Sequence, residues 1–157
     1  MSLEDNLDQV KQIIKEFFEK TSFDLEVYFL PIENNTLSIE IKTAEPQILI
    51  GEGGQTLADM QHILKAILRR RIEEIFYLNI DINDYKKKKI EYLKELAKTA
   101  ADEVAMTRKE KELSPMRSFE RRVVHMELAG RKDITTDSIG NDPERRIVIK
   151  PSEPSLY

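Results

Sequence analysis

Cysteine is absent from the 157 residues of this chain, and histidine occurs only twice. Without cysteine, the chain can form neither a disulfide nor a zinc–thiolate site. His62 and His125 also lack the sequence neighbours of a catalytic triad or a metal site, and His62 is interpreted as a structural residue of a helix. We therefore predict a protein that is not an enzyme and that carries no metal and no cofactor.

Long apolar runs are missing as well. No stretch approaches the roughly 18 apolar residues that a membrane-spanning helix needs. The N-terminus begins with acidic residues and has no apolar signal segment. Apolar residues make up 40% of the chain and charged residues 34%, which is typical of a folded, well-solvated domain. The sequence predicts a cytoplasmic protein with no membrane span.

Glycine is scarce, but three of the five glycines fall within the four residues from Gly51 to Gly54. They lie between two segments with helical apolar spacing, so they form a Gly-x-x-Gly turn before a helix. Free N–H groups and the positive dipole end favour phosphate there, and KH modules grip RNA backbones in this way. Gln55 and Thr56 do not fit a Walker loop or a dinucleotide fingerprint. The alternative is a tight helix–helix turn without a ligand.

The net charge of −4 conceals an uneven distribution. Residues 1–50 carry 10 acidic and 4 basic side chains, whereas residues 85–132 carry 8 acidic and 14 basic side chains. Phosphate contacts are local, because salt screens charges more than about 10 Å apart. The local excess of +6 in residues 85–132 therefore predicts a partner that is a polyanion, although the chain is acidic overall.

Hydrophobic periodicity predicts an α+β fold of two small modules. Helical spacing indicates helices over residues 3–17, 47–50, 57–71 and 85–108, and a further helix that starts at Ser114-Pro115 and ends near Gly130. Alternating patterns indicate strands over residues 24–30, 37–42, 76–83, 109–113, 134–138 and 145–149. We predict domains at residues 1–84 and 85–150, with helices on a three-stranded sheet in the second, and a loose tail at 151–157.

Potential cations recur every four residues in the helix after Pro115. Helical geometry places three of them within an arc of about 80°. Arginine pairs with phosphate through two nitrogens and stacks on bases. We therefore predict a nucleic-acid-binding surface made of six residues: Arg117, Arg121, Arg122, His125, Arg145 and Arg146. The alternative is a solvated helix face with salt bridges to Glu120 and Glu127.

Several motifs resemble those of a known family. The segment Leu49-Ile-Gly-Glu-Gly-Gly-Gln-Thr-Leu57 resembles the loop of a type II KH domain. Three later segments resemble the arginine–three–histidine domain: Phe119-Glu-Arg-Arg-Val-Val-His125, Ile134-Thr-Thr-Asp-Ser-Ile-Gly140 and Pro143-Glu-Arg-Arg-Ile-Val-Ile149. In this order, over about residues 3–151, the chain resembles the Jag family of bacterial RNA-binding proteins, also called KhpB or SpoIIIJ-associated proteins.

The resemblance implies a single-stranded RNA-binding protein. It implies a type II KH domain with helices on a small mixed sheet, followed by the arginine–three–histidine domain with Arg121 and His125 as its signature pair. It further implies a small KH-domain partner protein and a post-transcriptional role linked to cell elongation and division. The KH loop implied by the resemblance consists of Gly51, Glu52, Gly53 and Gly54.

Two departures from the family pattern bear on this function. Members commonly carry a basic residue in the KH loop, where this chain has Glu52, and a carboxylate near a phosphate costs about 1 kcal/mol near a surface. This favours the alternative that the KH half docks a protein partner and that RNA binding is weak or incidental. Many members also carry an extra N-terminal domain, whereas this chain starts directly with the predicted first KH helix.

Overall fold

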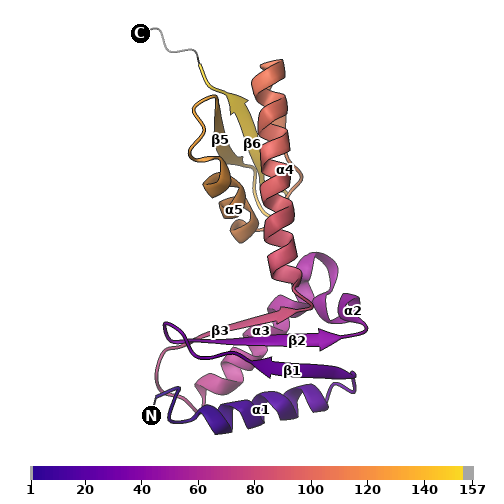
Figure 1. Cartoon of the computed structure of the whole chain (residues 1–157), viewed down its shortest axis with the longest axis vertical. Coiled ribbons are helices and arrows are strands. Elements are labelled where there is room, and N and C mark those ends of the chain that lie inside the picture. Colours follow the sequence, from indigo (N-terminus) through magenta and orange to yellow (C-terminus); the bar gives the residue numbers. More distant parts are fainter. Residues whose placement is uncertain (1, 154–157) are drawn as a thin grey trace. The chain divides into compact units, whose positions relative to one another are not determined.

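The computed structural model describes residues 2–153 and shows an α+β fold with two three-stranded sheets (Figure 1). The chain divides into two compact units, Met1–Lys86 and Lys87–Tyr157, just beyond the boundary predicted from the sequence. Pro151, at the start of the predicted tail, belongs to the last strand, and residues 154–157 lie outside the described residues. None of the helices in residues 2–153 has the length and apolar character that a membrane crossing requires.

The first unit packs its helices against one face of a mixed sheet. Its elements are α1 Leu7–Glu19, β1 Leu25–Phe29, β2 Thr36–Thr43, α2 Pro46–Ile50, α3 Gln55–Arg69 and β3 Tyr77–Ile82. Strands β1 and β2 are antiparallel, and β2 and β3 are parallel, in the order β1-β2-β3. Alternate strand residues such as Ile39 and Ile80 point toward the core and meet the buried sides of helices α1 and α3.

Two side chains, Gln61 of α3 and Lys86, protect the free edge of β3. Gln61 Oε1 accepts hydrogen bonds from the Ile80 backbone N–H (3.0 Å) and from Lys86 Nζ (2.9 Å). Burial lowers the pKa of the Lys86 ammonium below its ordinary value of 10.5, and the nearby Asp81 partly offsets this effect. Lys86 is thus a structural lysine of the first unit, with its ammonium engaged by Gln61 and Asn79.

The second unit packs two helices against an antiparallel sheet. Its elements are α4 Tyr85–Thr107, β4 Lys111–Glu112, α5 Ser118–Leu128, β5 Ile134–Ile139 and β6 Arg146–Pro151. The strand order is β4-β6-β5, and the three strands predicted for this module are confirmed. The long helix α4 contributes Leu93, Ala97 and Val104 to the core, and α5 contributes Val124 and Leu128.

Helix α5 begins later than the sequence predicts. The predicted start is Ser114-Pro115, but Arg117 is the N-cap, and its backbone N–H donates to Glu120 Oε2 at 2.8 Å. The preceding segment remains extended because its backbone is bound elsewhere. Met116 N–H donates to the Arg145 carbonyl (3.1 Å), just before β6. The predicted helix start is therefore wrong, because tertiary hydrogen bonds replace those of a first helical turn.

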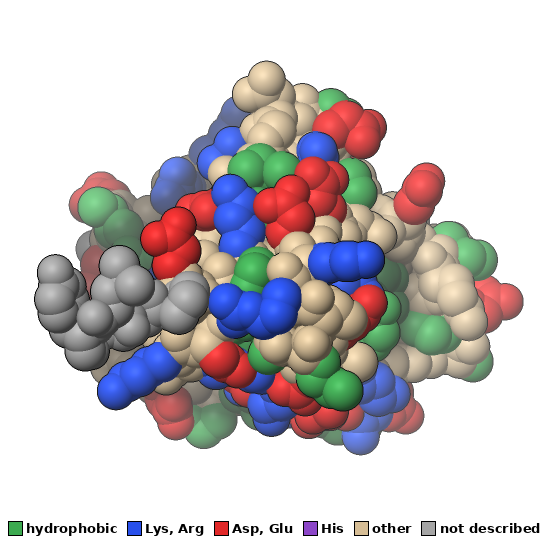
Figure 2. Space-filling model, turned by 90° about the horizontal axis from the view of Figure 1, so that it is seen from above, with side chains coloured by type: hydrophobic (Ala, Val, Ile, Leu, Met, Phe, Trp, Pro, Cys, Tyr) green, Lys and Arg blue, Asp and Glu red, His purple; other side chains and the backbone are tan. Residues whose placement is uncertain are grey.

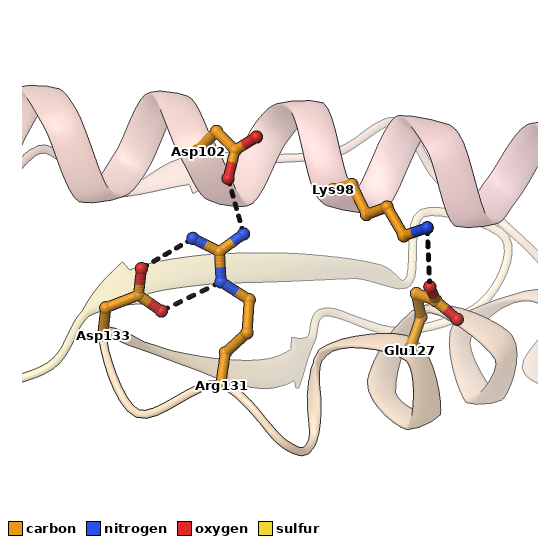
Figure 3. Close-up of polar contacts among 5 residues, drawn as sticks. All are labelled: Lys98, Asp102, Glu127, Arg131 and Asp133. Carbon is orange, nitrogen blue, oxygen red and sulfur yellow. Dashed lines mark hydrogen bonds and ion pairs between the residues drawn. The ribbon is translucent and has the colours of Figure 1, made fainter.

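Ion pairs fasten α5 and the turn after it to α4, as Figure 3 shows. Arg131 donates to Asp102 on α4 (2.6 Å) and to both carboxylate oxygens of Asp133 at the start of β5. These hydrogen bonds hold the pKa of Asp133 below its ordinary value. Lys98 on α4 lies 3.4 Å from Glu127 on α5. Lys98 and Arg131, two of the cations in the basic stretch of the sequence, thus hold α4, α5 and the following turn together.

Candidate nucleic-acid interface

The Gly-x-x-Gly loop of the first unit has backbone angles that require glycine at its two ends. Gly51 has φ 72° and ψ 178°, and a Cβ atom there would lie 2.1 Å from Thr56 Oγ1. Gly54 has φ 80°, and its missing side chain leaves room for the ring of Tyr85, 3.2 Å from an ideal Cβ position. Both glycines therefore have a structural reason to be present, whether or not the loop binds a ligand.

The middle of the loop is open to solvent. Glu52 and Gly53 are both exposed, and nothing lies within 4 Å of an ideal Cβ atom at Gly53. Since glycine has no side chain, the exposed surface of Gly53 is its backbone, next to the N-terminal end of the 15-residue helix α3. The N-terminal end of a helix favours an anion. Here the carboxylate of Glu52 already places a negative charge close to the start of α3, and this charge repels a phosphate.

In the second unit, Arg121 joins the start of α5 to the loop between β5 and β6. Its Nη1 donates to the Met116 carbonyl at 2.6 Å and lies 3.8 Å from Asp142 Oδ1. Only 9% of Arg121 is exposed. The three predicted cations are therefore not an open row, because the middle one is directed to the protein's own backbone.

His125 connects α5 to β5. Its Nδ1 shares a hydrogen bond of 2.7 Å with Thr136 Oγ1, and the side chain is half-buried. Of the predicted signature pair, Arg121 thus ties α5 to the segment before it and to the β5–β6 loop, and His125 ties α5 to β5. Their contact with RNA remains a prediction.

The other predicted cations lie nearer the surface. Arg117 caps α5 and is half-buried, and Arg145 donates to the Gly140 carbonyl at 2.7 Å. Arg146 is paired with Glu112 at 2.9 Å, so its charge is compensated. Arg122 is exposed, and its side chain makes no hydrogen bond or ion pair within residues 2–153. It is the motif's clearest candidate for an incoming phosphate.

Part of the positive charge of this unit is compensated internally. The predicted salt bridges of Glu120 and Glu127 exist, but their partners are the α4 residues Lys89 and Lys98, not the arginines of α5. Figure 2 shows one face of the molecule on which Lys and Arg side chains lie among Asp and Glu side chains. The local excess of charge in the sequence is therefore only partly compensated. Arg122 and Arg145 on this motif pair with no carboxylate in residues 2–153, and neither do the exposed lysines Lys88, Lys94, Lys109 and Lys132.

Sequence reasoning missed that Arg121 is buried, although a signal was present. Val124 and Leu128 lie three and seven residues after it, which is the spacing of one helix face, and both are in the core. The partner loop carries Asp142, which was also missed because a turn containing Asn, Asp and Pro is usually interpreted as a solvent-exposed connection.

Two family comparisons match this architecture. Residues 10–92 match the KH domain, over more than half of the chain, and residues 91–151 match the arginine–three–histidine domain. The chain belongs to the KH domain family. Its KH domain is followed by the arginine–three–histidine domain, which confirms the Jag-type order that the motifs predicted. The two matches meet within α4, the helix in which the two compact units also divide.

Similar proteins are named RNA-binding protein KhpB. The chain is 32% identical to that of Lactiplantibacillus plantarum over 90% of its own length and 42% of the relative's. It is 28% identical to the Clostridium symbiosum protein, over 90% of this chain and 64% of the relative. It is 34% identical to the Bacillus subtilis protein, over 73% of this chain and 56% of the relative. The chain thus spans less than two thirds of the length of these relatives.

Proposed function

We propose that this protein binds single-stranded RNA, without catalysis, and that the second unit supplies most of the electrostatic contact. The observation that carries the proposal is the exposed guanidinium of Arg122, which pairs with no carboxylate in residues 2–153, whereas Lys89 and Lys98 of the same unit are held in ion pairs. An arginine that the fold does not use is available to a phosphate. The names of the relatives support RNA as the polyanion and favour a cytoplasmic location. A link to cell elongation and division remains a prediction.

The test is the salt dependence of binding by the full chain to a fluorescent single-stranded RNA. Replacing Arg122 with alanine should weaken binding about fivefold to tenfold, the effect of one charge-assisted contact. The slope of log affinity against log salt should flatten by about 0.7, the value for one phosphate on a single strand. RNA recovered after incubation with a divalent metal ion should remain full-length, since the proposal involves no cleavage.

Arg70→Ala is the matched control. Arg70 is exposed at the end of α3 and makes no ion pair or side-chain hydrogen bond within residues 2–153, so this variant removes the same charge from the first unit. Its binding should change less than about twofold, well under the effect of one lost contact. Equal losses in both variants would indicate a response to net charge, and a wild-type slope near zero would contradict the proposal.

A second candidate function is favoured by the acidic surface of the first unit. A hollow of about 480 Å³ beside the ends of its strands is lined by Asp24, Glu26 and Asp84, with Lys42 as the basic residue. Together with the exposed Glu52, these carboxylates disfavour phosphate and suit a protein partner, such as a small KH-domain protein. In that case the KH unit docks the partner and the second unit holds the RNA.

Replacing Glu52 with lysine separates the two roles of the KH loop. If the loop faces phosphate, the variant gains the contact and loses the repulsion, so single-stranded RNA should bind roughly tenfold more tightly. If the loop docks a protein, RNA affinity should stay within about twofold. Fluorescence titration measures the difference, and Glu45→Lys, at an exposed residue before α2, controls for the added charge.

A further inference from the structure

We propose that Phe119 is a stacking surface for a nucleobase, working beside Arg122 on the exposed side of α5. This inference rests on the proposed function and adds to it a contact with a base, where the cations supply contacts with phosphate. The ligand is an unpaired base of a single strand, because a base in a duplex is already stacked on both faces.

The two sides of α5 differ sharply. Glu120, Arg121, Val124 and Leu128 are buried against the rest of the unit. The opposite side presents Phe119 with 47% of its surface exposed and Met126 with 67%, separated by the exposed Arg122. These positions are three and four residues apart, so the side chains are neighbours on the helix surface. The fold leaves an aromatic ring in solvent directly beside an unpaired cation.

Phe119 differs from the exposed tyrosines in that no cation lies over its ring within residues 2–153. Tyr28, Tyr77 and Tyr92 are each covered by a lysine ammonium, at 5.3, 5.4 and 5.7 Å from the ring centroid. Phe119 has no ring contact of this kind within residues 2–153. A phenyl ring that neither packs in the core nor receives a cation can accept a base on its face.

The charge beside the ring favours a nucleic acid strand over an apolar protein surface. Arg122 lies between Phe119 and Met126, so a purely apolar partner would have to bury an unpaired guanidinium, which is costly. A single strand satisfies both groups, because the base covers the ring while the adjoining phosphate pairs with Arg122.

The first measurement compares variants of the full chain in binding a single-stranded RNA. Phe119→Leu should weaken binding at least about fivefold, since base–aromatic stacking contributes that much or more per base. The salt slope should stay unchanged, because no charge is removed. Tyr92→Leu, at a ring that already carries Lys89, should bind as the wild type does. Equal unfolding temperatures of the two variants verify that both are folded.

The second measurement uses the absence of tryptophan from the chain. Phe119→Trp places a sole tryptophan at the site, and single-stranded RNA should quench its emission by stacking. The same strand with abasic riboses, or inorganic polyphosphate, should leave the emission unchanged. Unaltered affinity of Phe119→Leu, an equal loss in Tyr92→Leu, or unquenched emission with RNA bound would each overturn the inference. Failure of the wild type to bind RNA would instead overturn the proposed function.

Discussion

Replacing Arg121 with alanine is expected to lower the free energy of unfolding of the second unit by about 3 kcal/mol, whereas the same change at Arg122 should cost less than about 0.5 kcal/mol. Arg121 is buried, and it donates to the Met116 carbonyl at 2.6 Å. Its loss leaves that carbonyl without its charged donor and removes the packed stem of the side chain. Arg122 makes no such contact within residues 2–153.

The hydrogen bond to the backbone, and not the ion pair, should dominate this effect. Asp142 lies 3.8 Å from Arg121, but 80% of its side chain is exposed, so solvent screens the attraction. Asp142→Ala should therefore cost under about 1 kcal/mol. Arg121→Met, which keeps the apolar stem, should fall between the alanine variant and the wild type.

Denaturant unfolding of the full chain measures these losses, and amide exchange at Met116 reports the local opening. The adjacent arginines should give opposite results: Arg121→Ala loses stability, and Arg122→Ala loses RNA affinity at full stability. If Arg121→Ala unfolded like the wild type but bound RNA poorly, Arg121 would be a direct ligand of the phosphate after all.

Gly51→Ala should destabilise the KH unit by about 3 kcal/mol or more. The new Cβ would lie 2.1 Å from Thr56 Oγ1 and 3.0 Å from the Thr56 backbone nitrogen, so rotation of the threonine alone does not relieve the clash. The backbone angles of Gly51, φ 72° and ψ 178°, also lie in a region that essentially only glycine adopts. Loss of the turn would separate α2 from α3.

Gly53→Ala is the control for this prediction. Gly53 has φ 59° and ψ 19°, a left-handed conformation that costs a non-glycine residue about 1–2 kcal/mol. Nothing lies within 4 Å of its ideal Cβ position, so no clash adds to that cost. Thermal unfolding followed by circular dichroism should rank Gly51→Ala well below Gly53→Ala. Equal stability of the two variants would show that the loop rearranges without strain.

Periodicity in the sequence predicted the elements of both units well, because both types of module bury one regular face. The alternation in residues 76–83 and the helical spacing after Gly54 each place apolar side chains on the side that packs in the core. Periodicity could not predict that α5 starts later than Ser114-Pro115. Ser114-Pro115 is a sound local start signal, but the backbone pairing of Met116 with Arg145 depends on residues far along the chain.

The functional surface was harder to predict than the fold. Helical spacing predicted Arg117, Arg121 and His125 on one side of a helix, but Arg117 is the extended N-cap of α5 and Arg121 is buried. Spacing alone does not show which cations the protein uses for its own structure. Glu120 and Glu127 form their ion pairs with lysines of α4, which lie next to α5 only in the folded unit. Phe119 belongs to the motif Phe119–His125 in the sequence. That its ring lacks the lysine found over each exposed tyrosine can be known only from the folded structure.

The pairing of charges in the second unit has a kinetic consequence. Where a cation and a carboxylate pair, as at Lys98, Arg131 and Arg146, their fields cancel within a few ångströms, so these pairs add little to the potential that guides an approaching strand. Steering then falls to the exposed cations that pair with no carboxylate in residues 2–153, such as Lys88, Lys94 and Arg122, and added salt should slow association toward the unsteered rate of about 10⁵–10⁶ M⁻¹s⁻¹. At high salt, affinity for RNA would then be set by how slowly a captured strand leaves the surface, and selection among transcripts would operate on residence time.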